Sequence, residues 1–348
     1  MTQVEPAMRQ GRRIAVADLA EQIEAILRRH GLNEVQAGAL ARTMVAGERD
    51  ACKSHGIYRI EGALRTVAAG KVRPDAVPRL AEEGEGPIVR VDAQHGFANP
   101  AFELGAPALA RAARRHGLAA LVINDCTHFA ALWPEVEALA AEGLAALALC
   151  PSYASVAPAG GIRPLLGTNP LAFGWPRREG HPYVFDFATS VAARGELELK
   201  RRAGEELPEG WAIDRDGQPT RDPEAGLAGA MLPFGGHKGS AIGTMIELLA
   251  GVMIGDLTSP EVLDKLGTTT LAPMHGELIL AFSPEHFARG RPGDPLQRAE
   301  ALFEAILGQG ARLPSQRRFA ARAVSERDGI ELTGPEFALL DRLLNGAA

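Results

Sequence analysis

The chain has 348 residues, of which 46% are hydrophobic and 23% are charged, and its formal net charge at pH 7 is −6. This composition is ordinary for a globular enzyme that is long enough to form two or three lobes around substantial cores. The acidic balance excludes a general affinity for nucleic acid or for an acidic membrane, although a local cluster of arginines or lysines can still hold a small anion.

The first two predicted elements are helices near the N-terminus. Residues 1–13 precede them as a charged tail that lacks the apolar core of a signal peptide. A helix is predicted over Val16–Arg29, because large aliphatic residues recur there on one helical face. Asn33 with Gln36 resembles a capping box and predicts a second helix that runs to about Asp50.

From residue 88 onwards the sequence is typical of mixed α/β structure. Short apolar runs at 88–91, 119–123 and 144–149 alternate with alanine-rich helical segments and with Gly/Pro turns. Residues 207–223 are rich in glycine and proline and predict a loop. Residues 235–239 then lead into an apolar helix, 240–254, which Glu247 interrupts and which is too short to cross a bilayer.

The C-terminal part predicts a helix near 296–307, a basic stretch at 312–318 and a final helix after Thr333. The cysteines show no CxxC spacing, so neither a disulfide scaffold nor a zinc knuckle is expected. Since no targeting or membrane-spanning segment is evident, we expect a cytoplasmic location.

Common nucleotide-binding and hydrolase motifs are missing from the sequence. It contains neither the complete glycine fingerprint of Rossmann dehydrogenases nor the P-loop spacing, and neither HExxH nor GxSxG occurs. Rossmann dehydrogenases, P-loop NTPases and zincin proteases are therefore excluded as leading candidates.

Ser54-His55-Gly56 with Arg59 is the first polar cluster that can carry chemistry. Histidine suits general acid catalysis near neutral pH, and an arginine four residues later can hold a carboxylate with two hydrogen bonds. The same residues are also typical of a helix end with solvated polar groups, and that interpretation stays open.

Two further clusters lie in glycine-rich surroundings. One is Gly167-Thr168-Asn169-Pro170 together with residues 186–190. The other, residues 235–239, places His237 and Lys238 at the start of a helix, where backbone N–H groups and the lysine favour an anion. A tight turn that merely requires glycine is the alternative for this last cluster.

In this order the clusters resemble the malate/L-lactate dehydrogenase type 2 superfamily, a lineage without the Rossmann fold. The resemblance runs from about Ile14 to the C-terminus and rests on eight motifs. They are Ser54-His55-Gly56 with Arg59, His128-Phe129, Pro158-Ala159-Gly160-Gly161, residues 166–170, residues 186–190, Pro208-Glu209-Gly210-Trp211, Gly217-Gln218-Pro219-Thr220 with Asp222-Pro223, and residues 232–239.

Within the superfamily, residues 128–137 and 232–240 resemble the branch of Δ1-piperideine-2-carboxylate/Δ1-pyrroline-2-carboxylate reductases. The resemblance implies an NAD(P)H-dependent reductase that converts a carboxylate-bearing cyclic imine to L-pipecolate or L-proline, with NADPH as the expected cofactor and NADH as the alternative. Two other functions stay open. One is a 2-oxoacid/2-hydroxyacid dehydrogenase of the malate, lactate or ureidoglycolate type, and the other is a non-catalytic nucleotide-binding subunit.

The resemblance also implies roles for individual residues. His55 matches the proton donor and Ser54 a member of its charge relay, while Arg59 and Thr168 match substrate contacts. The implied cofactor contacts are His128, Phe129, Ala130, Ala131, Leu132, Asp186, Phe187, Ala188, His237, Lys238, Arg312, Arg317 and Arg318. No metal is expected in the reaction, because an iminium is already electrophilic.

One motif departs from the branch. Where its members usually carry a His-Gly-Asp triplet with a relay aspartate, this chain has Arg194-Gly195-Glu196. Glu196 keeps a carboxylate on a longer arm and is the candidate for the third catalytic residue, while Arg194 adds a positive charge. A solvated glutamate at a helix start is the alternative interpretation of Glu196.

These observations predict an α/β fold of the non-Rossmann, type 2 malate/lactate dehydrogenase kind, with a helical lobe built from both chain ends. Residues 14–85 with 285–348 are expected to form the helical, substrate-binding lobe, and residues 86–284 the NAD(P)H-binding and catalytic domain. The resemblance further implies a homodimer with the active site near the subunit interface. The expected ligand is a small carboxylate, with neither nucleic acid nor a membrane as partner.

Overall fold

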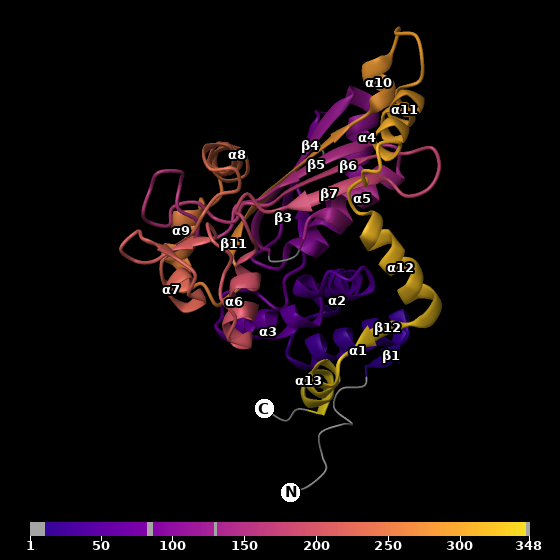
Figure 1. Ribbon diagram of the computed structural model, residues 1–348. Helices are drawn as coiled ribbons and strands as arrows, with labels where there is room; N and C mark the ends of the chain where they lie inside the picture. Colours follow the sequence, from indigo (N-terminus) through magenta and orange to yellow (C-terminus); the bar gives the residue numbers. More distant parts are fainter. Residues whose placement is uncertain (1–10, 82–85, 129–130, 346–348) are drawn as a thin grey trace, which may run out of the picture.

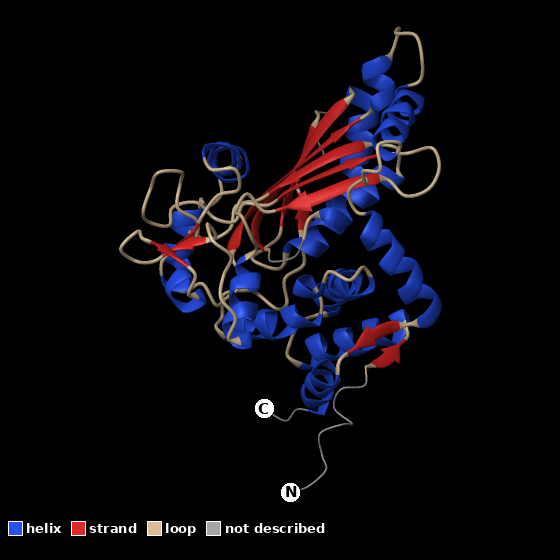
Figure 2. Cartoon of the chain, viewed as in Figure 1, coloured by secondary structure: helices blue, strands red, loops and turns tan. Residues whose placement is uncertain are grey.

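A mixed sheet of seven strands organises the chain, for which the computed structural model describes residues 11–81, 86–128 and 131–345 (Figures 1 and 2). Its strands, in spatial order, are β2 (Arg79–Leu80), β3 (Ile88–Asp92), β4 (Leu118–Thr127), β11 (Met274–Phe282), β5 (Ala145–Leu149), β6 (Leu171–Trp175) and β7 (Tyr183–Phe187). β3 and β4 pair in parallel, and the other neighbouring pairs are antiparallel. The expected α/β fold without a doubly wound parallel sheet is therefore confirmed.

The two faces of this sheet are covered differently. α4 (Ala98–His116) and α5 (Trp133–Ala141) pack on one face, where alternate strand residues join a continuous buried core. On the opposite face, α8 (His237–Glu247) continues into a π-helical turn, η4 (Leu248–Val252), which packs against β11. The predicted apolar helix at 240–254 is thus present, and it begins a few residues earlier than expected.

Both chain ends contribute to one helical lobe. The apolar faces of its helices share a core that includes Leu19, Ile23, Met44, Ile60 and Leu340. Its elements are β1 (Arg12–Ile14), α1 (Val16–Arg29), α2 (Glu34–Arg49), α3 (Ile60–Ala68), β12 (Ile330–Leu332) and α13 (Gly334–Asn345). Because β1 pairs with β12, the first described strand lies beside the strand that precedes the final helix, as expected for a lobe built from both chain ends.

Residues 285–348, which were expected to belong wholly to the helical lobe, lie only partly in it. α10 (Pro284–Ala288) follows β11, and α11 (Pro295–Leu307) lies beside the sheet, where Phe303 stacks on Tyr183 with 5.2 Å between ring centroids. α12 (Gln316–Asp328) then leads back to the helical lobe. The two-domain boundary remains a proposal.

A smaller subdomain lies next to the sheet and the helical lobe. Its three-stranded sheet has the order β10-β8-β9, so the predicted loop at 207–223 contains two short strands. The elements are α6 (Arg194–Ala203), β8 (Ala212–Ile213), β9 (Pro219–Thr220), α7 (Pro223–Ala228), β10 (Ala230–Met231) and α9 (Ser259–Leu266). Leu197, Leu207 and Met231 lie in its apolar core. Across the described ranges, no helix is both long and apolar enough to cross a membrane.

A buried ion-pair network joins the helical lobe to the sheet. Arg318 of α12 contacts Asp50 at 3.0 Å and Glu137 of α5 at 2.7 Å, and Arg322 pairs with the same two carboxylates. Burial alone would raise the pKa of Asp50. Hydrogen bonds from Arg322 and Arg49 outweigh that effect and lower its pKa to about 2. Three helices distant in sequence are therefore held together by charge.

Breaking this network is expected to destabilise the protein. Asp50→Asn leaves buried guanidinium groups without a full counter-charge and should lower the free energy of unfolding by about 3 kcal/mol at neutral pH, measured by urea denaturation. Arg42→Gln, which removes the exposed Arg42–Glu103 pair, should change it by less than ~1 kcal/mol.

The pH dependence supplies a second check. Because the pKa of Asp50 is depressed in the folded state, its contribution is complete above the ordinary value of 3.8 and is lost as the pH falls towards about 2. The stability difference between wild type and Asp50→Asn should shrink in that window. Equal destabilisation by Asp50→Asn and Arg42→Gln at neutral pH would contradict a structural role for the network.

Candidate active site

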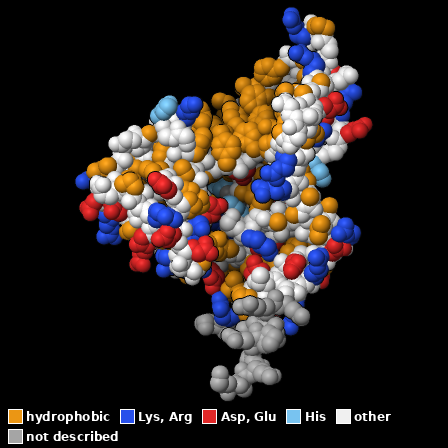
Figure 3. All heavy atoms as spheres, in the orientation of Figure 1, with side chains coloured by type: hydrophobic (Ala, Val, Ile, Leu, Met, Phe, Trp, Pro, Cys, Tyr) orange, Lys and Arg blue, Asp and Glu red, His pale blue; other side chains and the backbone are white. Residues whose placement is uncertain are grey.

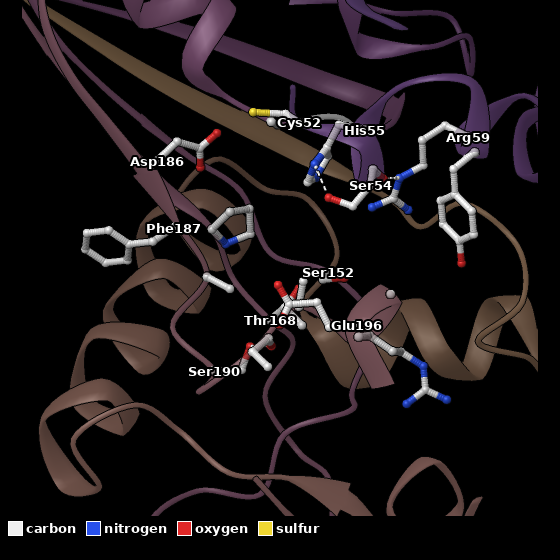
Figure 4. A pocket seen from close by; sticks show the side chains of 18 of the residues that line it. Cys52, Ser54, His55, Arg59, Ser152, Thr168, Asp186, Phe187, Ser190 and Glu196 are labelled. Carbon is white, nitrogen blue, oxygen red and sulfur yellow. Dashed lines mark hydrogen bonds between the residues drawn. The ribbon is translucent and has the colours of Figure 1, made fainter. Parts of the chain in front are cut away.

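A cavity of about 1530 Å³ lies where the helical lobe, the sheet and the smaller subdomain meet (Figure 4). Side chains from the turns after α2, from β7, from the start of α6 and from residues 312–318 line its walls. Residues distant in sequence therefore face one partly open space that is large enough for a small substrate and a dinucleotide.

Two short 3₁₀ turns, η2 (Lys53–His55) and η3 (Ile57–Arg59), carry the first cluster. Between them, a Cβ atom at Gly56 would overlap the buried carboxylate of Glu48, which accepts a hydrogen bond from the backbone N–H of Ile57 at 2.8 Å. Glycine is therefore required at this position, and the close approach fixes the path of the chain on both sides of it.

Ser54, His55 and Arg59 lie together on one wall of the cavity (Figure 4). Ser54 Oγ lies 3.0 Å from His55 Nδ1, and Arg59 Nε donates to the Ser54 carbonyl at 2.7 Å. The ring of Trp133 meets the His55 ring edge to face, with centroids 5.9 Å apart. The cluster predicted from the sequence is thus a single packed unit.

The His55 imidazole is held in its neutral form. Burial, together with the positive charge of Arg59 and the neighbouring His128, lowers the pKa of His55 to about 3. At neutral pH, one ring nitrogen therefore donates a hydrogen bond and the other accepts one.

Thr168 lines the cavity wall opposite this cluster, on a loop that is held in place by hydrogen bonds. The Thr168 carbonyl accepts from the backbone N–H of Thr189 at 2.8 Å. Next to it, the buried amide of Asn169 donates to the carboxylate of Glu247 at 2.7 Å, and that carboxylate also accepts from Ser259 N. This hydrogen-bonded loop holds Thr168 at the wall of the cavity.

Asp186, Phe187 and Ala188, at the end of β7, also line the cavity. Asp186 Oδ2 accepts from the backbone N–H groups of Leu132 and Trp133, at 2.8 and 3.0 Å. Burial nevertheless raises the pKa of Asp186 to about 6. Asp186 thus holds the start of α5, while the fully buried Leu132 side chain packs in the core and does not line the cavity.

The other predicted residues divide into three groups. His128, Ala131, Arg312, Arg317 and Arg318 line the cavity. His237 and Lys238 lie at the exposed start of α8, outside the lining of this cavity. Phe129 and Ala130 lie outside the described residues.

Glu196 is an exposed residue in the first turn of α6, and it lies across the cavity from His55 (Figure 4). Within the described ranges, no hydrogen bond joins Glu196 to Ser54 or His55. The Ser54–His55 half of the expected relay is therefore assembled, and the carboxylate lies on the facing wall.

Two residues of the cavity wall, Tyr153 and Thr269, had no sequence signal. The Arg194 guanidinium lies over the ring of Tyr153, which is close to Arg59, and its Nη2 also donates to the hydroxyl of Thr269 at 2.9 Å. Arg194, noted in the sequence as an added positive charge, is thus part of the cavity wall. Neither Tyr153 nor Thr269 belongs to a motif considered above, so only the tertiary fold identifies them.

A second group that sequence spacing did not reveal lies behind this wall. His128, Glu135 and Glu277 are buried together, with His128 Nε2 3.6 Å from Glu135 and 3.7 Å from Glu277. Burial raises the pKa of Glu135 to about 7 and raises that of Glu277 well above its ordinary value. His128 and Glu135 share residues 128–137, but Glu277 comes from β11, so no local motif contains all three.

Comparisons with known proteins agree on one family. The malate/L-lactate dehydrogenase family model matches residues 14–341. A Delta(1)-pyrroline-2-carboxylate reductase of Agrobacterium fabrum is 75% identical over 95% of this chain and 96% of its own. A Delta(1)-pyrroline-2-carboxylate/Delta(1)-piperideine-2-carboxylate reductase of Pseudomonas aeruginosa is 54% identical over 92% and 96%. The crystal structure of delta1-piperideine-2-carboxylate reductase from Pseudomonas syringae pvar. tomato superposes with a TM-score of 0.90, at 41% identity over 95% and 99%.

The pKa of His55 should respond to the charge of Arg59. Arg59→Met removes a like charge, so the pKa of His55 should rise from about 3 while remaining below 6.5, because burial persists. NMR titration of the imidazole carbon-bound protons measures this shift. Arg202→Met, which removes another arginine from the cavity wall, serves as the control. A wild-type His55 that titrates near 6.5 would show this description of the site to be wrong.

Proposed function

The chain belongs to the malate/L-lactate dehydrogenase family and is an oxidoreductase, and we propose that it reduces Δ1-pyrroline-2-carboxylate or Δ1-piperideine-2-carboxylate to L-proline or L-pipecolate with NAD(P)H. The observation that carries the proposal is the placement of a neutral His55 and a cationic Arg59 on one cavity wall. The functions named for the relatives support the same reaction. We also propose that the protein acts in the cytoplasm.

Arg59 supplies the carboxylate site of the proposed substrate. Its Nε is bonded to the Ser54 carbonyl, which fixes the plane of the guanidinium beside His55. An ion pair between Arg59 and the substrate carboxylate orients the adjacent C=N group towards His55. Thr168, on the facing wall, is the second proposed substrate contact.

His55 keeps the proton on the substrate nitrogen. A protonated C=N group carries an N–H, and the neutral imidazole accepts a hydrogen bond from it. Ser54 Oγ, at the other ring nitrogen, fixes the orientation of the ring. The imidazole therefore holds the proton at nitrogen while the neighbouring carbon is reduced.

The cavity has the features that a nicotinamide dinucleotide requires. When bound, this cofactor supplies a hydride to the carbon of the C=N group. Arg318 Nη2 lies buried without a hydrogen-bond partner among the described residues, and Arg312 and Arg317 line the same region. These three arginines are the proposed phosphate contacts, and the charges of Arg312 and Arg317 support a preference for NADPH over NADH, whereas Arg318 already pairs with Asp50 and Glu137.

Glu196 remains the proposed third catalytic residue. It faces Ser54 across the cavity, so a shift of the first turn of α6 on substrate binding would bring its carboxylate towards the relay. Glu196→Gln should therefore reduce kcat less than His55→Ala does.

A substrate panel tests the proposed function. NADPH oxidation is followed with Δ1-pyrroline-2-carboxylate, Δ1-piperideine-2-carboxylate, pyruvate and oxaloacetate. The imines should give the higher kcat/KM. Faster turnover of the ketones would identify a 2-oxoacid reductase instead, and no NADPH oxidation with any of the four would identify a nucleotide-binding subunit without this activity.

Substitutions should separate binding from chemistry. Arg59→Ala should mainly weaken substrate binding, and KM should rise by a factor that corresponds to about 2–4 kcal/mol of binding free energy. His55→Ala should depress kcat by roughly 10²-fold while cofactor affinity is retained, because water can still exchange the proton. The assignment of a clamp and a proton-handling residue fails if His55→Ala keeps the wild-type kcat, or if Arg59→Ala leaves KM unchanged for every carboxylate.

An exposed apolar face supports a homodimer as part of the proposal. Alternate strand residues of the sheet, including Phe173, Phe185 and Leu280, remain partly exposed beside α8 and η4. On η4, Leu248 and Val252 are 54% and 58% exposed. Figure 3 shows this apolar surface next to α8. A continuous apolar patch of this kind marks a protein interface, here with a second copy.

A charge placed on this face should dissociate the dimer. Val252→Lys introduces an ammonium group into the patch and should shift sedimentation towards the monomer, because burying an unpaired charge is costly. Val77→Lys is the matched control, since Val77 is 55% exposed on the helical lobe. A wild-type protein that sediments as a fully active monomer would count decisively against the dimer.

A further inference from the structure

The cluster of His128, Glu135 and Glu277 has the chemistry of a cation site. His128 follows β4, Glu135 lies in the first turn of α5, and Glu277 lies in β11. One ligand atom from each side chain lies within 4.8 Å of the other two. The His128, Glu135 and Glu277 side chains are 2%, 5% and 0% exposed.

In the described ranges, four polar atoms of this cluster are buried without a partner by hydrogen-bond geometry, and the carboxyl groups of Glu135 and Glu277 lie close enough to share a proton. His128 Nε2, Glu135 Oε2 and both carboxylate oxygens of Glu277 have no hydrogen-bond partner among the described residues. Buried carboxylates without a counter-charge are strongly unfavourable. Within the same part of the chain, no lysine or arginine pairs with either glutamate, since Arg318 and Arg322 are bound to Asp50 and Glu137. The cluster therefore favours a cation, and no lysine or arginine of the described residues supplies one.

The local backbone brings the three side chains together. The register between β11 and β4 shifts between His275 and Glu277, where β4 has one residue more than β11. A bulge of this kind bends the strand that carries the extra residue, here β4 shortly before His128. Pro134 lies in the first turn of α5 and precedes Glu135, which lies 3.6 Å from His128.

We propose that His128, Glu135 and Glu277 bind one divalent transition-metal cation of the Zn²⁺ class. Two carboxylates and a neutral imidazole leave no net charge around a dication. Donor atoms bound tetrahedrally at about 2.0–2.2 Å lie roughly 3.3–3.6 Å apart. The measured separations of 3.6 and 3.7 Å therefore need only a small closure. Each side chain supplies one donor, and a water molecule would complete the four ligands, because the two oxygens of one carboxylate are too close together to occupy two tetrahedral positions. Imidazole and carboxylate donors are both typical ligands of Zn²⁺.

The cation has a structural role, independent of the proposed reductase activity. His128 borders the cavity, whereas Glu135 and Glu277 do not line it, so the site lies behind the wall and offers the substrate no coordination position. Metal binding would tie the end of β4 to α5 and β11.

Metal content and binding test the proposal. The full-length chain, prepared without a histidine tag, should contain one zinc per chain by elemental mass spectrometry after dialysis. After removal of the metal with a strong chelator, it should bind one Zn²⁺ in competition with a chromophoric chelator. Co²⁺ should give the intense visible bands of a tetrahedral site.

Matched variants locate the site. Glu135→Gln and Glu277→Gln should each weaken Zn²⁺ binding at least ~10-fold, as expected for loss of a metal-orienting group. Glu142→Gln, which changes an exposed glutamate after the end of the same helix, should keep one equivalent.

Two results would overturn the proposal. The first is a folded wild-type chain, verified by circular dichroism, that contains no metal and takes up none at micromolar Zn²⁺. The carboxyls would then be satisfied by shared protons or buried water. The second is equal Zn²⁺ affinity in wild type, Glu135→Gln and Glu277→Gln. If a variant fails to fold, the wild-type measurements decide.

Discussion

The geometry of the cavity depends on the ion-pair network of Asp50 and Glu137 with Arg318 and Arg322. Asp50 is the residue at which α2 ends, so the network fixes the start of the turns that carry Ser54 and His55. On its other side, the Arg318 guanidinium lies 5.3 Å from the centre of the Trp133 ring, and that ring meets the edge of His55. Buried ions are tolerated only when every partner is in place, so the helical lobe and the sheet can meet in few ways. The position of the imidazole follows from that restriction.

Burial alone does not decide the charge of each group in this region, because the available partner matters as much. Asp50 is fully buried, yet guanidinium groups keep its pKa low. Among the described residues, Asp186 accepts hydrogen bonds from backbone N–H groups, and burial raises its pKa to about 6. Neither oxygen of Glu277 accepts a hydrogen bond from a donor in the described part of the chain, and burial raises its pKa well above its ordinary value. The three carboxylates form a series from compensated to uncompensated charge, and the last member is where a cation would contribute most.

Sequence patterns predicted the parts of this molecule that are local. α1 has the expected bounds and α2 differs by one residue at its end, because amphipathic spacing and the Asn33 cap act within single helices. Ser54, His55 and Arg59 were predicted together because they share two consecutive turns. By contrast, β11 enters the sheet between β4 and β5 from far along the chain, and no local signal specifies that order. The helix α12 was expected only as a basic stretch, since its arginines are neutralised by tertiary partners. His237 and Lys238 lie at the exposed start of α8, outside the cavity lining, so their role as cofactor contacts stays a prediction.

The low pKa of His55 also distinguishes between the two substrate classes that the sequence left open. A ketone must receive a proton on oxygen as it is reduced, and a histidine with a pKa of about 3 carries almost no such proton at neutral pH. A cyclic imine brings its own basic nitrogen, so the proton can arrive on the substrate. If His55 were also protonated, the iminium, the imidazolium and Arg59 would place three positive charges around one carboxylate. With a neutral imidazole, the carboxylate offsets Arg59 and the iminium N–H finds an acceptor. A neutral imidazole beside a cationic Arg59 therefore suits an iminium carboxylate, in agreement with the reactions named for the relatives.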